Sequence, residues 1–219
     1  MTLALLFKDE FKGFYKSKVM LVLWVGLPIL SILMFFAMSG DVSGVPVSTP
    51  TAVVLGSIGG VLSAAMLVSS IISEKERHVY ELFLIRPVKR RDIILSKFLS
   101  TYSCIAIAGF ISLSLGMLID STRFGGISAP ILGATLTSLL LALSIMAIAC
   151  SAGVLIGFAS SSMLVGIILV IYGANQLSVM AALPGLLLPD QSWLTLIPGI
   201  LLPIILLLLA MRIFEKKEL

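Results

Sequence analysis

Six long apolar runs, separated by short polar links, account for most of the chain. A helix needs about 20 mainly apolar residues to cross the hydrocarbon core of a bilayer. The runs that meet this length are residues 19–38, 51–73, 98–119, 129–157, 163–183 and 194–213. They leave little chain over, so we expect one all-α integral membrane domain over residues 1–219, with six transmembrane helices and no separate soluble domain.

Residues 1–18, ahead of the first run, have an amphipathic pattern. Apolar residues recur at helical spacing on one face, and lysines lie on another. The apolar face holds Leu3, Phe7, Phe11 and Phe14, and the basic face holds Lys8, Lys12 and Lys16. This pattern suits a helix in the headgroup region, in contact with membrane lipids. We expect an interfacial helix with a bend near Gly13. The alternative is that the lysines only anchor the first span by their charge.

Composition and charge agree with a membrane protein and orient it. The chain is 59% hydrophobic and 12% charged, against about 25% charged in soluble domains. Of its 15 Lys and Arg residues, four precede the first run, seven lie between the second and third, and three lie at or after the end of the last. Because cytoplasmic loops carry the excess of cations, we expect a multi-pass protein of the cell membrane. The same rule places both termini and the central loop in the cytoplasm.

The runs contain no charged residue in their interiors, which argues against transport driven by ions through carboxylates of the chain itself. There is no P-loop and no other familiar catalytic motif. We therefore expect no catalytic residue, no metal site, no cofactor bound by this chain and no nucleic-acid partner. Cys104 and Cys150 are interpreted as packing residues.

Two further features lie within the runs: a row of small residues and a pair of amides. Gly56, Gly59, Gly60 and Ala64 recur at a spacing that lets helices approach closely. Asn175 and Gln176 form the only amide pair in the fifth run. One hypothesis places this pair on a translocation route near its outer gate, and the alternative is a hydrogen bond between helices.

The central loop, residues 74–97, is the most distinctive segment. Its charged start, Glu74-Lys75-Glu76-Arg77, is followed by the apolar patch Leu82-Phe83-Leu84-Ile85 outside the expected membrane. Pro87 ends the patch, because the residue before a proline disfavours helix. Exposed apolar residues of this kind mark an interaction site. We expect a short cytoplasmic helix that docks a partner through Glu76, Arg77, Tyr80, Glu81, Leu82, Phe83, Ile85, Pro87, Arg90 and Arg91.

This loop resembles the one that follows the second span in permease subunits of ABC-2 type ABC transporters. The matching residues are Glu74-Lys75-Glu76-Arg77, Glu81-Leu82, Pro87-Val88, Arg90 and Asp92-Ile93. The chain departs from the family's pattern at His78-Val79, where Gly-Thr is common, and at Lys89, where Ser is common. The order of the interfacial helix, six spans and central coupling loop is also similar to that family.

The resemblance implies a permease subunit, expected to be an exporter, without an ATPase of its own. ATP and Mg²⁺ would bind a separate cytoplasmic ABC ATPase subunit, and a second copy or homologue of this chain would complete the membrane part. The alternative is a membrane anchor that transports nothing and transmits ATP-driven changes to other proteins. Lipids, drugs, peptides and small ions remain open as substrates.

Overall fold

The computed structural model is helical almost throughout the part that it describes, which is residues 3–38, 48–77, 90–123, 126, 129–187 and 196–216. Its elements are α1 (Leu3–Tyr15), α2 (Lys18–Met38), α3 (Ser48–Glu76), α5 (Arg90–Arg123), α6 (Ala129–Ala159), α7 (Met163–Leu169), the π-helix η1 (Val170–Ala174), α8 (Asn175–Leu187) and α9 (Leu196–Lys216). No strand occurs in these ranges, so the prediction of an all-α chain is confirmed.

Five stretches of helix are long and apolar enough to cross a membrane. They are Pro50–Glu76, Arg91–Thr122, Leu132–Ala159, Met163–Met180 and Leu196–Phe214. Helices α1 and α2 pass the same test only as a pair, which is bent by 68° where they meet, so the number is six if this pair is one span. Each expected span coincides with one helix or with a continuous helical run. The fifth run is divided by the π-helix η1, which the apolar pattern did not predict.

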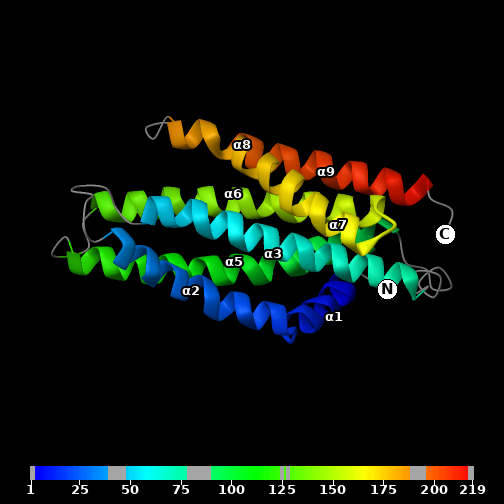
Figure 1. Cartoon of the computed structure of the whole chain (residues 1–219), viewed down its shortest axis with the longest axis horizontal. Coiled ribbons are helices and arrows are strands. Elements are labelled where there is room, and N and C mark those ends of the chain that lie inside the picture. Colours follow the sequence, from blue (N-terminus) through cyan, green and yellow to red (C-terminus); the bar gives the residue numbers. More distant parts are fainter. Residues whose placement is uncertain are drawn as a thin grey trace.

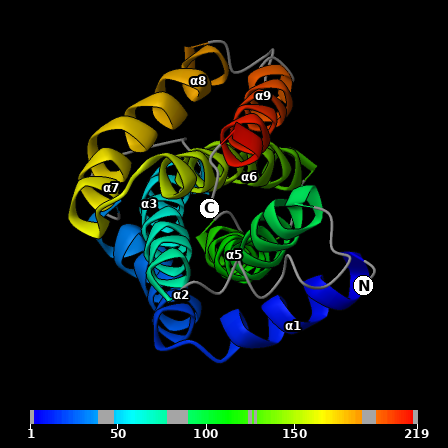
Figure 2. The ribbon, with the colours of Figure 1, turned by 90° about the vertical axis from the view of Figure 1, so that its right-hand side faces the viewer.

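The helices lie side by side in an elongated bundle (Figure 1). Helices α3 and α6 occupy its centre: 72% of the apolar stretch of α6 is buried, against 22% of that of α9, which lies at the edge. The start of α1 and the end of α9 lie toward the same end of the bundle (Figure 1). Seen from that end, α1 lies across the bundle beside α5 (Figure 2).

Glycines and alanines bring α3 and α6 into close contact. A Cβ atom added to Gly153 of α6 would lie 2.8 Å from the Cα of Ala64 in α3. One added to Gly60 of α3 would lie 2.8 Å from the Cβ of Ala149 in α6. Real Cβ atoms do not approach so closely, so larger residues would push the helices apart. The small-residue row expected from the sequence is therefore a helix-packing surface.

The amphipathic helix at the N-terminus exists, but its apolar face contacts protein. Leu6 and Phe14 of α1 are buried, and Phe14 belongs to the main core cluster, with Phe11 packed against it. The three lysines of the basic face are exposed. Because α1 packs against α5, protein covers much of the apolar face that suggested a headgroup environment. An amphipathic pattern alone does not show whether the apolar face of a helix contacts lipid or protein, because both surroundings are apolar.

The bend after α1 lies at Lys16 and Ser17, so the prediction of a bend near Gly13 was wrong. Helix α1 continues through Gly13 to Tyr15, and α2 begins at Lys18. The hydroxyl oxygen of Ser17 accepts a hydrogen bond from the backbone N–H of Met20 at 3.2 Å. A serine in this position caps the first turn of a helix. A new helix therefore begins after Ser17, whereas Gly13 is accommodated within α1.

Candidate functional site

The residues expected to dock a partner are only partly described. Glu76 and Arg77 are exposed at the end of α3, and Arg91 is exposed in the first turn of α5. Arg90 is the first residue of α5. The rest of the set, Tyr80, Glu81, Leu82, Phe83, Ile85 and Pro87, lies outside the described residues. The four described residues therefore lie at the end of α3 and at the start of α5.

The boundaries of the expected loop 74–97 change in the structure. Helix α3 extends through Glu76, and α5 already begins at Arg90. Residues 90–97 therefore form about two turns of helix rather than part of a loop. Their helical geometry fixes which side chains point into the bundle.

A buried cluster of ion pairs surrounds Lys97. Its side chain is 1% exposed, and its Nζ donates to Oε1 of Glu74 at 2.6 Å and to Oε1 of Glu10 at 2.9 Å. The hydroxyl of Ser70 also donates to Oε1 of Glu74, at 2.9 Å. The cluster joins three helices, because Glu10 lies in α1, Glu74 in α3 and Lys97 in α5.

Helix α5 extends beyond the expected span 98–119 at both ends. Its apolar stretch, Arg91–Thr122, includes both Lys97 and Asp120, and both are buried. The expected span began only at residue 98, which placed Lys97 at the edge of a solvated loop. Buried ionisable groups are costly, and in membrane proteins they pair and mark functional positions.

The sequence does contain a signal for this cluster. Lys97 continues the inward face of α5, three residues after Ile94 and four before Thr101, and both neighbours are fully buried. Glu10 lies three residues after Phe7 and four before Phe14, on the apolar face of α1. A charge at a core position of a helical pattern indicates a buried partner, although the pattern does not identify it.

A second lysine joins α3 to α6. Nζ of Lys75 donates to the backbone carbonyls of Gly157, Phe158 and Ser160 at 2.9, 2.7 and 3.1 Å. These carbonyls lie at the end of α6, where the last turn of a helix leaves acceptors without helical partners. A cation there also complements the negative end of the helix dipole. Lys75 therefore fixes the end of α6 to α3.

The four-residue motif Glu74-Lys75-Glu76-Arg77 consequently divides into two halves. Glu74 and Lys75 make contacts inside the bundle, and Glu76 and Arg77 face outward. The second half is exposed, whereas Glu74 and Lys75 are half-buried. This division was not visible from the sequence, because all four residues are charged and adjacent.

The amide pair lies directly after the π-helix. Asn175 begins α8, and its N–H donates to the carbonyl of Val170, five residues earlier. Asn175 is half-buried, whereas Gln176 is exposed. The Oδ1 atom of Asn175 is buried without a hydrogen-bond partner among the described residues. Such π-helical turns occur frequently at functional sites. Among the described residues, however, no polar group is shown to form a hydrogen bond with the Oδ1 atom of Asn175.

No protein-family model matches the chain, and no curated protein matches it.

Proposed function

We propose that the chain is the membrane-spanning permease subunit of an ATP-driven ABC transporter of the ABC-2 type. The observation that carries the proposal is the buried Lys97 cluster, which links the two helices flanking the loop 78–89. A partner that moves this loop would act on the end of α3 and the start of α5. Those two ends are joined by the contact between Lys97 and Glu74.

The contacts suggest how such a motion would spread. Glu10 brings α1 into the same ion-pair cluster, and Lys75 connects α3 to the end of α6. Four helices are thus linked at one end of the bundle by charged side chains. Buried ion pairs hold a defined geometry, because breaking one leaves an uncompensated charge. Motion of the loop would therefore move the four helix ends together.

The proposal assigns ATP binding to a cytoplasmic partner. In this scheme the ATPase subunit contacts the apolar patch around Phe83 together with Glu76 and Arg77. A second copy or homologue of the chain completes the membrane part, and the direction of transport is export. The motif of the loop supports this assignment through its similarity to ABC-2 permeases.

Co-purification from native membranes tests the proposal directly. The tagged chain should recover a protein that carries a P-loop and hydrolyses ATP. Phe83→Asp should abolish this recovery while leaving the membrane part folded. Charge reversal provides a matched pair: Arg77→Glu should reduce recovery, and Arg212→Glu, exposed on α9, should not.

Two results would contradict the proposal or redirect it. Full recovery of the ATPase with Phe83→Asp would refute the docking assignment. An ATPase complex that hydrolyses ATP but moves no compound across vesicles carrying the whole assembly would favour the non-transporting anchor.

A further inference from the structure

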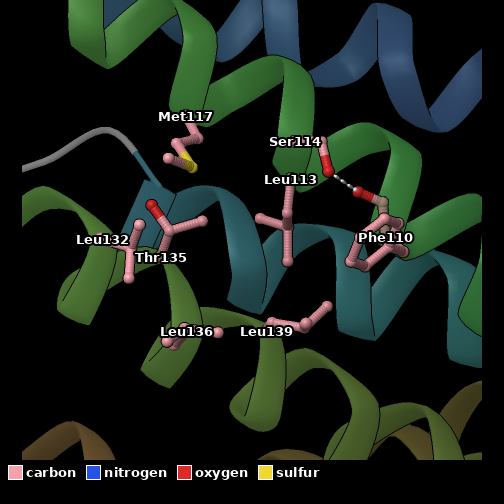
Figure 3. A pocket seen from close by; sticks show the side chains of 8 residues that line it. All are labelled: Phe110, Leu113, Ser114, Met117, Leu132, Thr135, Leu136 and Leu139. Atoms are coloured by element: carbon pink, nitrogen blue, oxygen red, sulfur yellow. Dashed lines mark hydrogen bonds between the residues drawn. The ribbon is translucent and has the colours of Figure 1, made fainter. Parts of the chain in front are cut away.

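A pocket lies between α5 and α6, in the half of the bundle away from Lys97. It encloses about 200 Å³. Figure 3 shows that its side chains come from two facing helices, with Phe110 to Met117 on α5 and Leu132 to Leu139 on α6. The lining residues are Phe110, Leu113, Ser114, Met117, Leu132, Thr135, Leu136 and Leu139.

The chemistry of the lining selects an apolar occupant. Six of the eight side chains are apolar, and none is charged. The hydroxyl of Ser114 donates to the carbonyl oxygen of Phe110 at 2.7 Å (Figure 3), so its proton is already used. A ligand with several polar groups would lose its hydration here without gaining hydrogen bonds of equal strength.

The pocket opens toward the outside of the bundle. Its floor includes Leu113, which is 1% exposed, and its rim includes Phe110 and Leu136, which are 59% and 52% exposed. All lining residues belong to the stretches Arg91–Thr122 and Leu132–Ala159, which are apolar enough to cross a membrane. In a bilayer such a rim would face hydrocarbon rather than water.

We propose that this pocket holds one acyl chain of a bilayer phospholipid. An empty apolar cavity of about 150 Å³ in a protein core already binds benzene or xenon, so about 200 Å³ accommodates a segment of hydrocarbon. The lipid-facing rim gives an acyl chain direct access from the bilayer, and the chain's headgroup stays outside the pocket. This proposal concerns α5 and α6 alone and does not depend on the assignment as a permease.

Photo-crosslinking with a labelled lipid tests the site. The full chain is reconstituted into phosphatidylcholine vesicles that contain a phosphatidylcholine with a diazirine in its acyl chain. After irradiation, adducts are mapped by peptide mass spectrometry. We expect adducts on Phe110–Met117 and Leu132–Leu139 to exceed those on similarly exposed apolar residues of α9, such as Leu201 and Ile204, by about threefold. The preference is modest because free lipid is equally apolar.

A variant that fills the pocket, together with a matched control, tests whether the adducts come from a lipid bound in the pocket. Leu139→Trp places a larger side chain in the pocket and should reduce the local adducts to the level on α9. Leu209→Trp, on an exposed face of α9, should leave them unchanged.

Equal labelling of both regions would overturn the proposal, since it would indicate only the surrounding lipid shell. Adducts that persist in a folded Leu139→Trp variant would also overturn it. Disulfide crosslinking of cysteines placed at Leu136 in two copies would contradict it too, because the pocket would then be an interface between subunits.

Discussion

Removal of the Lys97 charge provides the sharpest test of the structure. Lys97→Met introduces an apolar side chain of similar length and removes the ammonium group that Glu10 and Glu74 share. Two carboxylates then face each other without their cation. Breaking a buried ion pair from one side costs about 3–5 kcal/mol. The side chains of Glu10 and Glu74 remain 25% and 24% exposed, and partial hydration places the expected loss near the lower end, about 3 kcal/mol.

The measurement is unfolding of the purified chain in mixed micelles of dodecylmaltoside with a rising fraction of SDS, followed by tryptophan fluorescence. Lys12→Met serves as the control, because Lys12 is exposed on α1 and surface substitutions change stability by about 0.5 kcal/mol or less. Lys97→Met should unfold at a lower SDS fraction than the wild type, and Lys12→Met should not.

A triple variant separates charge from packing. Glu10→Gln and Glu74→Gln combined with Lys97→Met remove all three charges at nearly constant volume. Replacing a whole buried ionic cluster by hydrophobic residues is often neutral or stabilising. The two glutamines keep the partial exposure of Glu10 and Glu74, so water can hydrate their amides and the triple variant should regain more than half of the lost stability. The reasoning is refuted if Lys97→Met is as stable as the wild type, or if the triple variant is no more stable than the single one.

Three further predictions concern packing, topology and the amide pair. Gly153→Leu should destabilise the chain by about 1–3 kcal/mol through overpacking. The control is Gly133→Leu, whose Cβ would meet nothing within 4 Å and which should have little effect in the same unfolding assay. Equal effects of the two variants would contradict the close contact of α3 and α6. Single cysteines in a background without Cys104 and Cys150 test the topology with an impermeant thiol reagent added outside intact cells. Cysteines at residues 5, 86 and 217 should resist the reagent, and those at 43, 123 and 191 should react. Labelling of residue 217 from outside would exclude the six-span topology. Asn175→Leu should not reduce stability, because the buried Oδ1 has no partner among the described residues and unsatisfied groups cost about 1–3 kcal/mol. If Asn175 or Gln176 lines a route, the corresponding leucine variant alters transport or substrate-stimulated ATPase activity with normal assembly, and unchanged activity in both variants would exclude that role.

The sequence by itself determined the helices and their arrangement along the chain. Apolar runs of about 20 residues can satisfy their backbone groups in hydrocarbon only as helices or closed barrels, and their lengths match helical spans. The small residues of α3 also identified a packing surface, because the absence of a bulky side chain is a local property.

Only the tertiary structure showed how the charges at the end of α3 and the start of α5 are used. Lys97 is 87 residues from Glu10 and 23 from Glu74, so no local pattern could identify its partners. The apolar face of α1 was equally ambiguous, because Phe14 can enter lipid or pack against α5 and both surroundings are apolar. Hydrophobic periodicity shows which face of a helix is inward, but the neighbour that occupies that face depends on packing between distant segments of the chain.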